Sequence, residues 1–179
     1  FRNTGGDLKA TVRAILLDPE FTSDAVVRAE VKEPLETLIQ PIRALGGETQ
    51  GKSLYFWAYF SKQLPYYPPS VFSFYRPGRK AALVTSSQVA YLDYFADDFV
   101  DTYSDDFTDA TFDAGALIRD NRLKKPKKTV DFLADRLLSA PLEPSTRAAI
   151  VEYFGGQVTE EKVRGAVWLI ITSPDFQLN

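Results

Sequence analysis

The sequence predicts an all-α fold, an irregular multi-helix bundle of about seven or eight helices. Apolar residues recur three and four positions apart through most of the chain, and no alternating stretch typical of a half-buried strand has any length. The 179 residues are 45% hydrophobic and 25% charged, which suits one helical domain over residues 1–179 with its own core. Residues 65–79 lack the helical period and are expected to form a long irregular segment rich in proline and aromatic residues.

The first helix is predicted over residues 8–16. Leu8, Val12, Ile15 and Leu16 have the spacing of a single helix face, and Asp7 stands where an N-cap is needed.

Two more helices are expected before the irregular segment. The second spans residues 35–45 and ends at a pair of glycines. Pro41 lies inside it and is expected to kink or split the helix, because proline cannot donate the backbone hydrogen bond. The third, residues 53–64, is rich in aromatic residues.

Helices resume after the irregular segment. Thr85 and Gln88 have capping-box spacing at the start of a helix over residues 86–103. Short helices are predicted over residues 129–138 and 145–154. The last helix starts at Thr159 and carries one apolar face, made of Val163, Ala166, Val167, Ile170 and Ile171.

A short pattern occurs twice. "ILLDPEF" (residues 15–21) and "IITSPDF" (residues 170–176) both place an apolar helix end before a polar residue, a proline, an acid and a phenylalanine. Proline stops the helix, and the phenylalanine is then expected to fold back on the core. Two copies do not make a solenoid repeat.

Missing residue types exclude several chemistries. The chain has no cysteine and no histidine, so it contains no thiolate zinc site and no Ser-His-Asp or Cys-His machinery. Any metal would be a hard cation held by oxygens, and no cofactor is expected. The net charge of −3 argues against nucleic acid as a partner, and no apolar run is long enough to cross a bilayer. The chain starts at Phe1 without a leader, which indicates the interior of a longer protein.

The acidic run in residues 91–113 contains eight aspartates and no lysine, arginine or glutamate. On a helix over residues 86–103, three of these aspartates lie four residues apart, opposite an apolar stripe. We therefore interpret the run mainly as the solvated face of a helix. The stripe consists of Leu92, Phe95, Ala96, Phe99, Val100 and Tyr103, and the acidic face of Asp93, Asp97 and Asp101, with Asp98 beside them.

The second half of the acidic run is less regular. Asp105, Asp106 and Asp109 are the alternative candidates for a metal site or a catalytic carboxylate pair, although the calcium-loop pattern is absent.

A basic segment follows the acidic run. Residues 119–128 carry six positive charges and one negative charge. The favoured interpretation is that the acidic and basic segments face each other or that both face water. The alternative is that the basic segment binds an anionic ligand. The Lys-Pro-Lys-Lys sequence at residues 125–128 is typical of an exposed inter-helix loop.

The aromatic segment is the best candidate for a binding site. Ten of the 24 aromatic residues lie within residues 55–75. Exposed rings can stack on sugars, and arginines beside them supply planar donors. The alternative is that the segment crosses the helices as part of the core. The candidate ligand-binding residues are Tyr66, Tyr67, Phe74, Tyr75, Arg76 and Arg79.

Five stretches carry a family resemblance: "GDLKATVRAILLDPEF", "VKEPLETLIQPIRALG", "PPSVFSFYRPG", "LLSAPLEPSTRAAIVEYF" and "IITSPDFQ". In this order they resemble the C-terminal part of the domain-of-unknown-function 1800 family. The resemblance implies a mostly helical, exported bacterial protein whose N-terminal half lies outside this chain. Members are often encoded beside a sulfatase-like protein, and some carry carbohydrate-binding or adhesive domains. The resemblance supplies no catalytic residues.

Three functions remain open. The leading one is a non-catalytic helical module of a secreted, periplasmic or cell-surface protein, which acts in assembly or in polymer or glycan binding. Its partner would be another protein, the N-terminal half of its own chain, or a glycan. The second is a carboxylate-dependent hydrolase acting on polysaccharide. The third is half of an active site that the N-terminal half completes.

Overall fold

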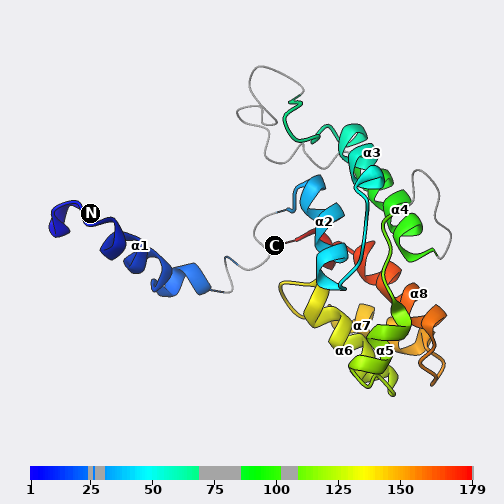
Figure 1. Ribbon diagram of the computed structural model, residues 1–179. Helices are drawn as coiled ribbons and strands as arrows, with labels where there is room; N and C mark the ends of the chain where they lie inside the picture. Colours follow the sequence, from blue (N-terminus) through cyan, green and yellow to red (C-terminus); the bar gives the residue numbers. More distant parts are fainter. Residues whose placement is uncertain (24–25, 27–30, 69–85, 102–108, 179) are drawn as a thin grey trace.

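The computed structural model describes residues 1–23, 26, 31–68, 86–101 and 109–178, with the backbone alone for residues 86–92 (Figure 1). These residues form eight α-helices, so the prediction of an all-α multi-helix fold is confirmed. The described residues contain no β-strand, only two isolated antiparallel bridges, Val31 with Leu178 and Glu48 with Thr111. No described helix is long and apolar enough to span a membrane.

The C-terminal helix α8 (Glu160–Ile171) is the centre of the core. It packs against α4 (Ser86–Val100), α5 (Ala114–Asp120), α6 (Pro126–Leu137) and α7 (Pro144–Tyr153). The side chain of Thr159 caps it by accepting from the Lys162 amide. The predicted apolar face is confirmed, because its five residues are all buried: Val163, Ala166, Val167, Ile170 and Ile171.

Helix α2 (Pro34–Ala44) runs without interruption past Pro41, so the predicted split does not occur. A capping box between Glu33 and Glu36 secures its first turn. Because Pro41 is buried in the core together with Leu38 and Ile42, packing compensates for the single backbone bond that proline removes.

Helix α3 (Lys52–Phe60) ends four residues earlier than the sequence predicts. The hydroxyl of Ser61 donates to the Trp57 carbonyl, and Lys62 then takes a positive φ of 63°. A left-handed residue cannot continue a right-handed helix. The chain therefore turns away at this point and leaves Leu64 outside the helix.

Helices α5 and α6 correct the prediction for the basic segment. Pro126 is the first residue of α6, where its fixed φ favours a helix start. The lysines at 127 and 128 thus belong to the first turn of a helix, and the inter-helix connection is limited to residues 121–125.

The N-terminal helix α1 (Leu8–Leu16) stands apart from the rest of the molecule in Figure 1. The predicted helix and its cap are confirmed, since the Asp7 carboxylate accepts from the Ala10 amide at 3.1 Å. Its apolar stripe is exposed, however, and neither α1 nor the following 3-10 helix η2 (Pro19–Thr22) buries any side chain.

Besides η2, the described residues contain two 3-10 helices, η1 (Arg2–Thr4) before α1 and η4 (Pro174–Gln177) after α8. Phe176 within η4 is buried, and the backbone beyond η4 pairs with Val31.

Candidate functional site

The first half of the acidic run behaves as predicted. Phe95, Ala96 and Phe99 of α4 are buried, while Asp93, Asp97 and Asp101 are exposed. The side chain of Leu92 and all of Tyr103 lie outside the described residues.

Two aspartates of α4 also have a structural role that the sequence did not indicate. The indole Nε1 of Trp168 donates to Asp97 Oδ1 at 2.7 Å, and that of Trp57 donates to Asp98 Oδ2 at 3.1 Å. Both tryptophans of the chain are thereby oriented by the acidic face of one helix. A tryptophan side chain has a single donor, and these carboxylates satisfy it.

Asp109 is a long-range cap of α3. Its carboxylate accepts from the backbone amides of Gln50, Lys52 and Ser53 at 2.6, 3.3 and 2.8 Å, and from the Ser53 hydroxyl. Gly51, the N-cap of α3, has no side chain to do this. Partial burial alone would raise the pKa of Asp109, but the bonds from Ser53, Gln50 and Lys52 lower that pKa to about 2.

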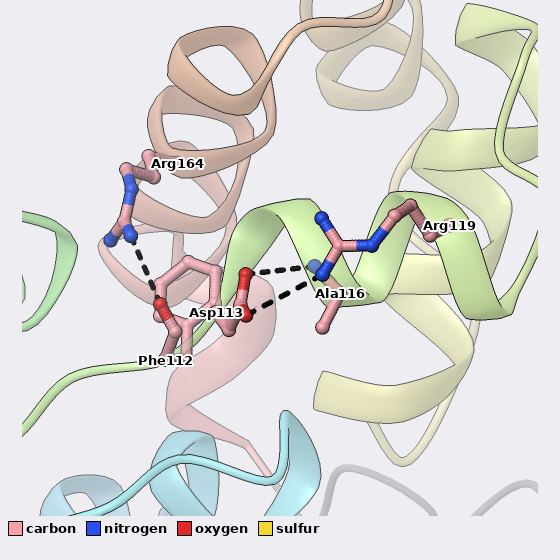
Figure 2. Close-up of polar contacts among 5 residues, drawn as sticks. All are labelled: Phe112, Asp113, Ala116, Arg119 and Arg164. Atoms are coloured by element: carbon pink, nitrogen blue, oxygen red, sulfur yellow. Dashed lines mark hydrogen bonds and ion pairs between the residues drawn. The ribbon is translucent and has the colours of Figure 1, made fainter.

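Asp113 begins α5 in the same way, through a local contact (Figure 2). Its Oδ1 accepts from the Ala116 amide at 2.8 Å, and its Oδ2 lies 3.8 Å from a guanidinium nitrogen of Arg119. Figure 2 also shows Arg164 of α8 donating to the Phe112 carbonyl. The two residues that precede α5, Phe112 and Asp113, are therefore each held by a hydrogen bond.

A metal site among the aspartates stays a prediction. In the described part of the chain, no three acidic side chains come close enough to hold a cation. Asp105 and Asp106 lie outside the described residues. Both carboxylate oxygens of Asp109 accept hydrogen bonds from amides at the start of α3.

The basic segment faces water over the described residues. Lys124, Lys125, Lys127 and Lys128 are exposed. Arg119 of the basic segment also forms an ion pair with Asp113 of the acidic run, at 3.8 Å. The favoured interpretation, that these charges are solvated, fits this arrangement.

An exposed group of rings lies at the end of α3, and we call it the aromatic surface. Tyr66 is 101% exposed and Tyr67 66% exposed. Helix α3 itself carries three more exposed rings. The aromatic surface consists of Tyr55, Tyr59, Phe60, Tyr66 and Tyr67.

The backbone holds the aromatic surface in place. The turn after α3 is closed by the Gln63 amide, which donates to the Ala58 carbonyl at 2.9 Å. The buried Gln63 side chain accepts from the Leu35 amide at 2.9 Å and so ties the turn to α2. Tyr66 has a φ of 62°, a left-handed conformation that is unfavourable for a residue with a side chain.

Two hollows flank the aromatic surface. The first, of about 530 Å³, is lined by Tyr66 with Pro65 and Pro68 and by Glu33, Leu35 and Gln63. The second, of about 410 Å³, is lined by Tyr67, Tyr59, Leu64 and Lys62. The adjacent tyrosines 66 and 67 therefore line different hollows, each with polar groups nearby.

Tyr66 and Tyr67 lie at the surface, and their role as binding residues stays a prediction. Tyr67 lines one hollow together with Tyr59 and Lys62, which were not among the predicted site residues, and Tyr66 lines the other hollow. The exposure of Tyr59 could have been predicted from the spacing within α3. Trp57 and Ala58 are buried, whereas Tyr55 and Tyr59, one turn apart, are exposed. The other predicted residues, Phe74, Tyr75, Arg76 and Arg79, lie outside the described residues.

A family profile described as "Protein of unknown function (DUF1800)" matches residues 1–178. The chain belongs to the DUF1800 family. No curated protein and no solved structure matches it. The DUF1800 description names no activity, so any function must be inferred from this chain's own residues.

Proposed function

We propose that this DUF1800 chain is a non-catalytic helical module that binds a polysaccharide through the aromatic surface, within an exported or surface-associated bacterial protein. The observation that carries the proposal is the complete exposure of Tyr66 beside the exposed Tyr67. The resemblance described above supports export and a role with polymers.

Exposed tyrosines are suited to sugars. A tyrosine ring offers a flat apolar face to the C–H groups of a pyranose and a hydroxyl at its edge. The polar side chains in the two hollows, Glu33 and Gln63 on one side and Lys62 on the other, can bond the sugar hydroxyls. Ligand sites commonly combine an apolar lining with a few polar groups of this kind.

The backbone conformation at Tyr66 supports a functional role for its exposed ring. A non-glycine residue with positive φ costs on the order of 1 kcal/mol, and such residues cluster at functional sites. Asparagine or glycine would adopt this turn more easily. The ring of Tyr66 is 101% exposed and buries no area against the described residues, which supports a role in binding a ligand.

Binding is favoured over hydrolysis by the state of Asp109. A glycoside hydrolase needs one carboxylic acid that gives up a proton near neutral pH. The pKa of Asp109 is lowered to about 2 and its oxygens are occupied by amides of α3. Asp109 therefore serves the fold and is a poor general acid.

The test uses the whole chain on insoluble cellulose and chitin and in gels that contain xylan, dextran or alginate. We expect retention by at least one polymer and a loss of about tenfold or more in affinity for Tyr66→Ala/Tyr67→Ala, since each stacked ring contributes about 1 kcal/mol. Phe1→Ala is the matched control, because it removes an exposed ring that lies outside the aromatic surface and should bind like the parent chain.

Two results would contradict the proposal. One is a parent chain that none of these polymers retards. The other is a double variant that retains the parent affinity.

A further inference from the structure

The α1–η2 segment exposes more apolar side chain than a solvated helix should. Leu8, Val12, Ile15 and Leu16 form its stripe and are 51–69% exposed, and Phe21 is 51% exposed. Leu17, which lies between α1 and η2, is 65% exposed as well. A contiguous apolar patch of this kind marks an interaction surface.

The C-terminal copy of the same motif shows how such a surface is used. In both copies the residue before the proline donates to the helix residue three positions back, Asp18 to Ile15 at 3.2 Å and Ser173 to Ile170 at 3.1 Å. The phenylalanine amides also donate alike, Phe21 to Asp18 and Phe176 to Ser173. In the C-terminal copy the apolar residues Ile170, Ile171 and Phe176 are buried, so the apolar side of the motif can be covered by packing.

A groove of matching size lies along α2. It measures about 630 Å³ and is lined by Glu33, Leu35, Glu36, Ile39, Gln40, Arg43 and Ala44. The eleven residues of α2 span about 16.5 Å, and the nine residues of α1 span about 13.5 Å. The two helices are therefore similar in length, as packing side by side requires.

The charges of the two elements are complementary. Lys9 and Arg13 lie one turn apart on α1, which has no acidic residue within its bounds. Glu33 and Glu36 lie at one end of the groove, with Arg43 near the other. Opposite charges on facing helices favour a specific partner and orientation.

We propose that the α1–η2 segment of one chain lies in the α2 groove of a second copy, and that the exchange is reciprocal. Helix α1 projects away from its own body (Figure 1), which presents it to another molecule. Reciprocal exchange gives a two-fold dimer in which each copy contributes one arm and one groove. The groove and the stripe are then covered in the same step.

Cysteine chemistry tests the contact directly, because the chain has no cysteine of its own. Val12→Cys chains and Arg43→Cys chains are purified separately, mixed, and treated with a short bis-maleimide. We expect a cross-linked heterodimer as the main product. Mixing Val12→Cys with Lys128→Cys chains is the control, since Lys128 lies at the start of α6, and it should cross-link at least tenfold less.

Sedimentation equilibrium provides the second readout. The parent chain should be dimeric at 100 μM. Leu16→Asp should be monomeric and equally folded, because Leu16 is already half exposed in the single chain. This result is independent of polysaccharide binding, for which Leu16→Asp should match the parent.

Several outcomes would overturn the proposal. They are a monomeric parent chain at 100 μM, an undiminished dimer in Leu16→Asp, or cross-linking to Lys128→Cys as strong as to Arg43→Cys. A doubly substituted Val12→Cys/Arg43→Cys chain that cross-links only within itself would show that the groove takes its own arm instead.

Discussion

The two copies of the helix–proline–phenylalanine motif have the same local structure and opposite environments. Leu17 and Thr172 end their helices with matching bonds of 3.1 and 3.0 Å to the carbonyls four residues back. Asp18 and Ser173 are both extended, with ψ of 130° and 153°. Yet Phe21 is 51% exposed and Phe176 is 1% exposed.

The difference teaches that local sequence determines the shape of the motif and distant residues determine its burial. Phe176 lies under the Lys32 ammonium, 4.2 Å from the ring centroid, and Lys32 Nζ also donates to the Phe176 carbonyl at 2.7 Å. Four helices surround α8, which precedes it. Among the described residues, nothing equivalent covers Phe21.

The largest expected contrast comes from removing each phenylalanine. Phe176→Ala should lower the free energy of unfolding by about 3–5 kcal/mol, because it empties a fully packed position. Phe21→Ala should change it by less than about 0.5 kcal/mol, as for other exposed sites. Urea unfolding of dilute, monomeric chains measures both. Equal losses would refute the contrast.

A smaller contrast separates the long-range cap from the local cap. Asp109→Ala should cost about 2 kcal/mol of global stability, because several amides of α3 lose a charged acceptor. Asp7→Ala removes the cap of α1 and should reduce helicity there without measurable global cost. Thermal unfolding paired with circular dichroism separates the two effects. A global loss of similar size in Asp7→Ala would mean that α1 belongs to the core.

A pH dependence of stability should be specific to the C-terminal copy. Burial lowers the pKa of Lys32 from 10.5 to about 8, although the nearby Glu36 acts to raise it. Between pH 8 and 10.5 the unfolded chain then binds more protons than the folded chain, so the free energy of unfolding rises with pH in this window.

Lys32→Met is the control for that dependence. The stability of the parent chain relative to Lys32→Met should increase as the pH rises from 8 to 10.5. A constant difference across this range would show that Lys32 titrates alike in both states.

Much of the fold was predictable because helix periodicity is a local signal. The buried face of α8 and the cap of α1 both follow from spacing within a few residues. The exposure of the α1 stripe could not be predicted. An amphipathic pattern shows that one helix face is apolar, but it does not show which residues pack against that face.

The site was predictable only in part, for the same reason. Tyr66 and Tyr67 stood out by composition, while the turn after α3 brings Tyr59 and Lys62 to the same hollow as Tyr67. The hydrogen bond from Ser53 to Asp109 joins residues 56 positions apart, and that from Trp168 to Asp97 spans 71. Contacts over such separations leave no periodic trace in one sequence.

Hydrogen exchange of the dilute monomer compares the two copies most directly. We predict that the Ile170 and Ile171 amides of α8 exchange only through global unfolding. The Ile15 and Leu16 amides of α1 should exchange through local fraying, orders of magnitude faster. Equal free energies of opening for the two pairs would contradict the conclusion that the same local motif is covered in one copy and uncovered in the other.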